Sequence, residues 1–149
     1  MKIFLDSYII SCFLRGELNE KDEYHLETIF LSNKQKKIEL ITLASTVEKI
    51  FRIPELNKTQ NIRLVLLMKK INPCFESSFF IDRENDVLQK VLSKFDNIEG
   101  QQIYQSIKNK CDYFLTLNSK ILDRKEDLLE LKFNPVSPFE LVKIILSVC

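Results

Sequence analysis

The segment Lys2-Ile3-Phe4-Leu5-Asp6-Ser7 opens the sequence, and its apolar residues 3–5 predict a short strand that ends at Asp6. Two later apolar segments, Ile38–Thr42 and Tyr113–Thr116, also predict strands, and helical patterns stand between them. Strands that alternate with helices favour a parallel sheet covered on both faces. The predicted fold class is therefore α/β, a three-layer sandwich in which a central, mostly parallel, twisted sheet is flanked by helices.

Apolar periodicity and punctuating residues predict the other elements. Helices are predicted at Ser7–Leu14, Glu20–Leu31, Ser45–Phe51, Lys58–Ile71, Asp82–Phe95, Ile98–Asn109 and Ser119–Lys125, and from Ser137-Pro138 through Ser147. Gly16 is expected to stop the first helix, Pro54 to break the third, and Asn72-Pro73 to end the fourth. Leu128–Phe133 is predicted as the last strand, whereas residues 73–81 give no clear prediction.

The composition is that of one soluble globular domain: 149 residues, 45% hydrophobic and 29% charged, with a net charge of +1. This balance argues against a histone-like binder of nucleic acid. Four dispersed cysteines and a single histidine do not form a clustered zinc site, and they indicate reduced thiols in a cytosol. The charged start is unlike a signal peptide, and the longest apolar run, Leu64–Met68, is too short for a membrane span. A cytoplasmic protein without membrane contact is expected.

Four oxygen-bearing side chains are expected at one end of the sheet, because open parallel sheets bind ligands at the carboxyl ends of their strands. Asp6 ends the first strand, and Glu48 lies in the first turn of the helix after the second strand. Glu99 opens the helix before the Tyr113–Thr116 strand, and Asn118 follows that strand. Carboxylates and an amide oxygen are ligands for a hard cation such as Mg²⁺ or Mn²⁺, which activates water and neutralises charge on phosphate.

Helix capping is an alternative explanation for each of these residues. Asp6 and Asn118 are both placed to cap a following helix. The segments Ser45-Thr46-Val47-Glu48 and Asp96-Asn97-Ile98-Glu99 have the spacing of capping boxes. Capping explains why each position is polar, but it does not explain why all four should share one end of the sheet.

Several segments resemble motifs of the PIN-domain nucleases. Lys2–Ser7 resembles the family's opening, a hydrophobic strand that ends in Asp followed by Ser or Thr. Ile41–Ile50 is similar to the second motif, where a strand-end Ser or Thr precedes a helical Glu by six residues. Cys111–Asn118 looks like the C-terminal strand motif, and Asn134–Leu141 like the Pro-containing start of the closing helix. The resemblance spans essentially the whole chain and implies a single PIN-like domain, residues 1–149.

The resemblance implies a ribonuclease that depends on Mg²⁺ or Mn²⁺, with Asp6 and Glu48 as metal ligands. The family's third acid falls seventeen residues before Thr116, at Glu99, where Asp is usual. Its fourth acid falls on Asn118. Glu keeps the charge on a longer arm, whereas Asn keeps only a neutral oxygen, which should weaken metal binding. Asp6, Glu48 and Glu99 are therefore expected to hold the ion, and Asn118 to position a water or a second, weaker metal.

Supporting roles are predicted for other residues near this end. The hydroxyls of Ser7 and Thr116 are expected either to orient ligands or waters or to cap helices and turns. Asp112 and Asp123 lie near enough in sequence to replace Asn118. The basic residues expected to hold RNA phosphates are Lys49, Arg52, Lys120, Arg124 and Lys125.

Other ring-bearing residues are given no role in the chemistry. His25 is expected on a helix surface. The aromatic residues Phe75, Phe79, Phe80 and Tyr104 are expected in the core or at an interface.

The resemblance also bears on partners, because many small bacterial PIN proteins are toxins of toxin–antitoxin pairs. It implies an RNA substrate, a small antitoxin protein and a homodimer. Asn118 favours an alternative, a degenerate PIN-like module that binds RNA or a protein partner without cleavage. A phosphoacceptor receiver domain is a third interpretation. It needs an acceptor Asp that follows an acidic pair and a full βαβ unit, whereas Asp6 opens the chain, so this interpretation is disfavoured.

Overall fold

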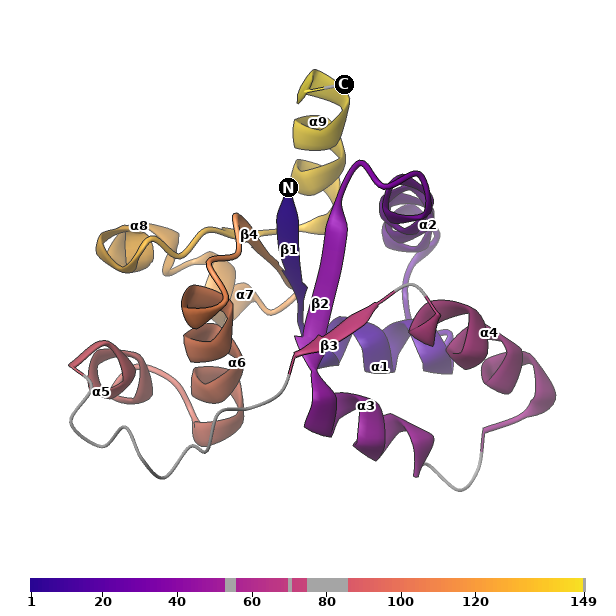
Figure 1. Ribbon diagram of the computed structural model, residues 1–149, viewed down its shortest axis with the longest axis horizontal. Coiled ribbons are helices and arrows are strands. Elements are labelled where there is room, and N and C mark those ends of the chain that lie inside the picture. The colour runs from indigo at the N-terminus through magenta and orange to yellow at the C-terminus, as the bar shows by residue number, and fades with distance from the viewer. Residues whose placement is uncertain (53–55, 70, 75–85, 149) are drawn as a thin grey trace.

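The structure is a computed structural model that describes residues 1–52, 56–69, 71–74 and 86–148. Within these ranges, five strands form one sheet: β1 (Lys2–Leu5), β2 (Glu39–Leu43), β3 (Asn72–Cys74), β4 (Tyr113–Leu115) and β5 (Pro135–Val136). Their order is β3-β2-β1-β4-β5, and each neighbouring pair is parallel. Figure 1 shows β3 crossing β2 at a steep angle, as a twisted sheet requires. The α/β prediction with a parallel sheet is confirmed.

Helices connect the strands, and most of them follow the predicted ranges closely. The predicted helix Ser119–Lys125 is wrong, because one helix ends at Leu122 and a separate one begins at Lys125. The described helices are α1 (Ser7–Arg15), α2 (Glu20–Lys34), α3 (Ala44–Phe51), α4 (Lys58–Met68), α5 (Asp86–Leu92), α6 (Asn97–Lys108), α7 (Ser119–Leu122), α8 (Lys125–Leu128) and α9 (Pro138–Val148). Gly16 ends α1 with a φ of 69°, a left-handed conformation that glycine adopts without strain. Ser137 and Glu140 cap the start of α9 reciprocally, as Ser137 Oγ accepts from the Glu140 amide and the Glu140 carboxylate accepts from the Ser137 amide.

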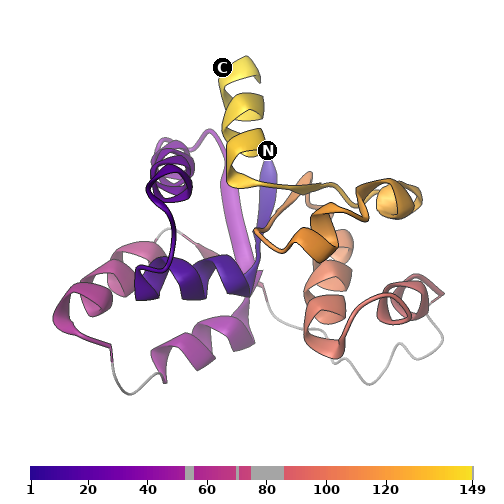
Figure 2. The same cartoon turned by 180° about the vertical axis from the view of Figure 1, so that it is seen from behind.

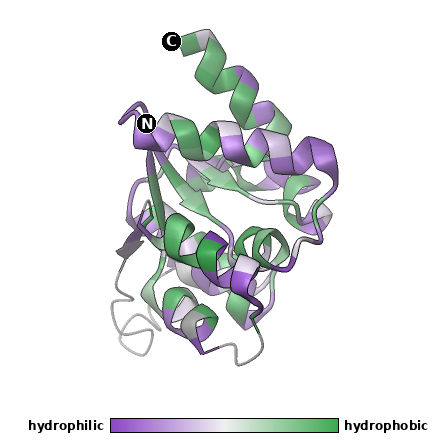
Figure 3. Cartoon of the chain, turned by 90° about the vertical axis from the view of Figure 1, so that its right-hand side faces the viewer, coloured by the Kyte–Doolittle hydropathy of each residue, from purple (hydrophilic) through white to green (hydrophobic). Residues whose placement is uncertain are grey.

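Side chains alternate across the sheet and bury two hydrophobic clusters. Ile3 and Leu5 of β1 belong to a cluster with buried residues of α1, α2, α4 and α9. Phe4 points the other way, into a cluster with buried residues of α5, α6, α7 and α8. There it stacks on Phe114 of β4, with ring centroids 5.4 Å apart. The two faces are visible in Figures 1 and 2, and the central strands are mostly green in Figure 3, consistent with a three-layer sandwich.

The predicted strand Leu128–Phe133 is wrong. This segment contains the end of α8 and a 3-10 turn, Leu129–Leu131, and the left-handed Lys132 (φ 55°) turns the chain. Leu128 and Phe133 are both buried, and the amide of Phe133 donates to the carbonyl of Leu128 at 3.4 Å. The apolar residues therefore anchor the two ends of a turn instead of lining one face of a strand, and the sheet continues in the two residues of β5.

The edge strand β3 begins where the sequence predicts the end of a helix. α4 ends at Met68, three residues before the predicted Ile71, and Asn72-Pro73 belongs to β3. Proline is tolerated here because β3 is paired only with β2 among the described strands. The predictions for Pro54, for Phe75, Phe79 and Phe80, and for the first turn of the Asp82–Phe95 helix lie outside the described residues.

The strand order fixes where a ligand can enter. From β1, the chain moves outward through β2 and β3 on one side, then returns to place β4 and β5 on the other. A crevice opens at such a reversal, between the carboxyl ends of β1 and β4. In Figure 1 this edge faces down, away from the N-terminus and α9. Across the described residues, no helix is long and apolar enough to cross a membrane.

Candidate functional site

Asp6 and Thr116 meet at the crevice between β1 and β4. Each residue directly follows its strand, and the Asp6 amide donates to the carbonyl of Leu115 at 3.1 Å. The Thr116 hydroxyl donates to Asp6 Oδ2 at 2.6 Å. Two residues 110 positions apart in the sequence are therefore held in contact by the pairing of the two central strands.

Asp6 is a buried acid with three hydrogen-bond partners. Only 4% of the residue is exposed, and its Oδ1 accepts from the amide of Tyr8 at 3.0 Å, which caps α1 as the capping interpretation predicts. Burial raises the pKa of Asp6 above its usual 3.8, and the negative charge of Glu99 raises it further. The hydrogen bonds from Thr116, Tyr8 and Gln102 oppose this shift without cancelling it. An acid held against its solvation preference is typical of a functional site.

Gln102 is part of the site, although no motif in the sequence indicated it. It is 3% exposed, its Oε1 accepts from the Ser7 amide at 2.8 Å, and its side chain hydrogen-bonds to Asp6. Gln102 lies three residues after Glu99 on α6, so the two side chains share a helix face. That spacing is the signal that could have identified it. Ser7 takes part through its backbone amide.

Glu99 and Asn118 form the second half of the site. Asn118 Nδ2 donates to Glu99 Oε1 at 2.7 Å, and Asn118 Oδ1 accepts from the amide of Lys120 at 3.1 Å, as a cap of α7. Glu99 and the Lys120 backbone fix the same orientation of the Asn118 side-chain amide, because the carboxylate requires a donor and the backbone N–H requires an acceptor. The backbone N–H of Asn118 in turn donates to the Thr116 hydroxyl oxygen at 3.0 Å. A continuous chain of hydrogen bonds therefore joins Glu99, Asn118, Thr116 and Asp6.

Among the described residues, Glu48 does not form a cluster of three acids with Asp6 and Glu99. α3 begins at Ala44 with Leu43 as its cap and without a capping side chain, so Ser45 is already inside the helix and the proposed Ser45–Glu48 capping box is wrong. The cause is that β2 runs directly into α3. The helix therefore starts one residue earlier than predicted, and Glu48 stands in its second turn, exposed to solvent. Asp96 does cap α6, through the amides of Ile98 and Glu99.

Asp112 and Asp123, the two acids considered as replacements for Asn118, lie in different parts of the fold. Asp112 lies at the opposite edge of the sheet, where its Oδ2 accepts from the amide of Lys2 at 2.7 Å. Asp123 is exposed and lines the same cavity as Glu99. The fold therefore separates Asp112 from the site and leaves Asp123 beside it.

Three of the five predicted basic residues line two cavities beside the network. Lys120 and Arg124 line a cavity of about 440 Å³ together with Glu99. Arg124 is held over the ring of Phe95 at 5.4 Å, and its guanidinium donates to the carbonyl of Lys94. Lys49 lines the other cavity, of about 380 Å³.

The two remaining basic residues line neither cavity. Lys125 lies 4.0 Å from Glu140, and Arg52 is exposed just beyond α3.

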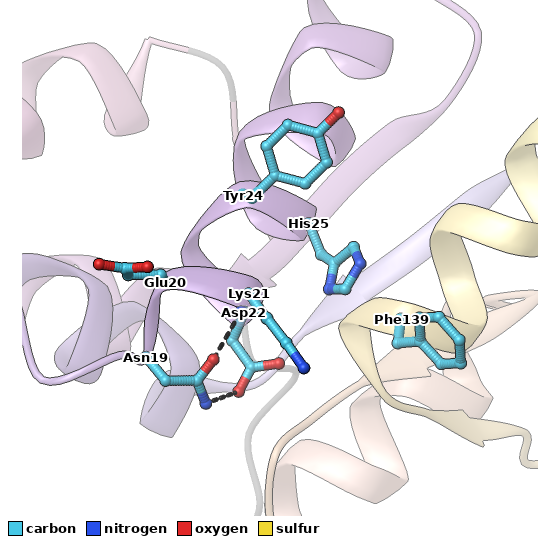
Figure 4. Close-up of a pocket in the computed structure, with 7 residues that line it drawn as sticks. All are labelled: Asn19, Glu20, Lys21, Asp22, Tyr24, His25 and Phe139. Carbon is cyan, nitrogen blue, oxygen red and sulfur yellow. Dashed lines mark hydrogen bonds between the residues drawn. The ribbon is translucent and has the colours of Figure 1, made fainter.

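A further cavity, of about 650 Å³, opens between α2 and the start of α9 (Figure 4). His25 faces Phe139 there, with ring centroids 5.5 Å apart, so it is half-buried instead of lying freely on the helix surface. Its Nδ1 is buried and has no hydrogen-bond partner among the described residues. Asn19 and Asp22, which line the same cavity, form hydrogen bonds with each other. None of the predicted site residues lines this cavity.

The donor set suits a magnesium-like ion through two carboxylates. Mg²⁺ in proteins is commonly held by one or two carboxylates, with water and substrate phosphate completing its shell. Asp6 and Glu99 can supply these carboxylates, because each keeps free lone pairs beside the hydrogen bonds described above. The Asn118 oxygen is turned towards Lys120. The described residues contain no group of three or more Asp, Glu, His or Cys side chains arranged for a metal.

Comparison of the chain with models of known protein families gives no match, and comparison with curated proteins gives no significant match.

The Thr116 hydroxyl is expected to stabilise both halves of the network. Replacing Thr116 by Val keeps the shape but leaves a buried carboxylate oxygen and the Asn118 amide without a partner. Such unsatisfied groups each cost about 1–3 kcal/mol, so for the two together we expect the free energy of unfolding to fall by about 2–6 kcal/mol. Denaturant unfolding of the Val variant, beside a Thr116→Ser control that retains the hydroxyl, measures it. Equal losses for Val and Ser would contradict a role for the hydroxyl.

The raised pKa of Asp6 predicts the sign of a pH effect. The folded protein binds this proton more tightly than the unfolded chain, so Asp6 lowers the free energy of unfolding as the pH rises from about 3.8 through the folded pKa. Asp6→Asn removes the charge and keeps a capping oxygen. We therefore expect it to raise the metal-free Tm at pH 7, by a margin that shrinks towards pH 4. A margin that is constant or grows on acidification would contradict this assignment.

Proposed function

We propose that this protein is a metal-dependent endoribonuclease that hydrolyses phosphodiester bonds in RNA. The observation that carries the proposal is the network of Asp6, Thr116, Asn118 and Glu99, which joins two carboxylates at the crevice of the sheet. The resemblance of the same segments to PIN-domain motifs supports RNA as the substrate. Cationic side chains beside Glu99 support a phosphate-bearing substrate.

Asp6 and Glu99 would hold the ion. When bound, Mg²⁺ or Mn²⁺ supplies an activated water and neutralises charge that develops on the scissile phosphate. Thr116 keeps Asp6 oriented through its hydroxyl, and Gln102 hydrogen-bonds to the same carboxylate. Lys120 and Arg124 lie where they can bind the phosphates that flank the bond. Glu48 could act as a third ligand of the ion only if its side chain moved from its exposed position on α3 towards Asp6 and Glu99.

A binding module without cleavage is the second candidate, and a specific contact favours it. The amide oxygen of Asn118 caps α7, and its nitrogen donates to Glu99, so position 118 offers no negative charge to a metal. RNA or a protein partner would then bind at the same face. For the nuclease, we also propose that a small antitoxin protein binds the chain and that the chain forms a homodimer. Analytical ultracentrifugation tests the dimer.

Incubation of the full chain with a pool of labelled, structured RNAs tests the proposal. The reactions contain Mg²⁺ or Mn²⁺, with EDTA as the control and single-stranded DNA of matched sequence as a second substrate. RNA fragments that form only with a metal are expected. RNA retained on the folded protein without fragments under either ion would support the binding module instead.

A further inference from the structure

A cavity of about 380 Å³ is lined by Ser7 and Gln102, which adjoin Asp6, and it shares no lining residue with the cavity of Lys120 and Arg124. Its lining residues belong to α1, α3, the end of β2 and the start of α6. Figure 1 shows these helices near the carboxyl ends of β1 and β2. Ser7 and Gln102 form the boundary it shares with the network, because Gln102 binds both the Ser7 amide and Asp6. Whatever occupies this cavity therefore lies one side chain away from the buried carboxylate.

The lining of this cavity has a distinct chemistry. Leu43, Ile50 and Ile98 give the cavity aliphatic surface. Tyr8, a residue that is 56% exposed, also lines it. The other lining groups are hydroxyls, amides and the ammonium of Lys49. Among the described residues, no carboxylate lines this cavity, whereas the cavity that Glu99 lines also contains Asp96 and Asp123 as well as cations.

This combination fits a flat, neutral, aromatic group attached to an anionic backbone. An exposed aromatic ring beside aliphatic surface offers a stacking platform, and hydroxyls and amides can hydrogen-bond to the edge of a base. The single lysine can bind one adjoining phosphate. A cavity intended for the phosphates themselves would be expected to carry several cations, as the Lys120 and Arg124 cavity does.

We propose that this cavity, the base pocket, holds one unpaired nucleobase of an RNA strand, next to the phosphodiester placed at Asp6 and Glu99. The inference rests on the proposed function and narrows its substrate to single-stranded segments, because a base stacked in a duplex cannot enter the pocket. The strand then runs from the base pocket across Asp6 and Glu99 towards Lys120 and Arg124.

RNA binding in EDTA tests the base pocket without cleavage. The probes are fluorescein-labelled hexauridylate and a hexamer of the same ribose-phosphate backbone without bases, and fluorescence anisotropy gives the Kd of each. We expect Tyr8→Ala to weaken hexauridylate binding about tenfold, because it removes one stacking platform, and to leave the abasic probe unchanged. Tyr8→Phe keeps the ring and should restore the affinity. Tyr24→Ala is the matched control, because Tyr24 is also an exposed tyrosine and lies on α2, away from this cavity.

The outcomes separate the base pocket from the nuclease activity. Unchanged hexauridylate affinity in Tyr8→Ala, or an equal loss for both probes, overturns the base pocket even where metal-dependent cleavage is observed. A base-specific loss restored by Tyr8→Phe supports it, including in a protein that does not cut RNA. The circular dichroism of each variant, expected to match the wild type because Tyr8 is exposed, verifies that the chain is folded.

Discussion

Asp6→Asn is expected to reduce metal-dependent RNA cleavage at least about 100-fold, because it removes one of two carboxylates that can hold the ion. Asn caps a helix as well as Asp does, so α1 should still begin at Ser7. The loss would therefore reflect the charge and not the fold. Initial rates of cleavage of a labelled RNA at saturating Mn²⁺ measure it.

The same variant should be more stable than the wild type without metal at neutral pH, as argued from the raised pKa of Asp6. Lower activity with higher stability is a signature of a functional site, where a strained group is retained for its chemistry. Asp112→Asn is the matched control, since it removes one carboxylate at the opposite edge of the sheet. Equal cleavage by the wild type and Asp6→Asn would exclude Asp6 from the reaction.

Asn118→Asp is expected to raise the affinity for Mn²⁺ about tenfold or more. The new carboxylate would face Glu99 at the position where the amide nitrogen now donates at 2.7 Å. Two like charges at this separation repel each other by some kcal/mol at the intermediate dielectric of a protein surface, and a divalent cation relieves that repulsion. Isothermal titration calorimetry with Mn²⁺ gives the affinity, and RNA cleavage should increase with it.

Without metal, Asn118→Asp should lower the free energy of unfolding, because the donor to Glu99 is lost. Ser119→Asp is the control, since it adds the same charge one position along on an exposed residue. Similar gains in affinity for both variants would show a general effect of charge, and no gain for Asn118→Asp would argue that position 118 does not adjoin the ion.

Local patterns predicted most of the elements correctly. The apolar run at residues 3–5 and the helix stopped at Gly16 both lie where expected, since strand hydrophobicity and a glycine cap are properties of a few neighbouring residues. The failures occurred where distant packing decides. Leu128–Phe133 has an apolar composition typical of a strand, but burial against Phe114 bends it into a turn. The three residues of β3 are too few to show the alternation of apolar and polar residues by which a strand is predicted.

The same division holds for the site. The sequence by itself predicted which polar residues follow the strands, because the boundary between an apolar strand and a cap is a local feature: Asp6, Thr116 and Asn118 are where it expected them. Only the tertiary structure decided their partners. It brought Glu99 to Asn118 and Gln102 to Asp6 and the Ser7 amide, and it left Glu48 exposed on α3. The reason is physical, since the angle at which a helix leaves a strand depends on the packing of the whole sheet and not on its own residues.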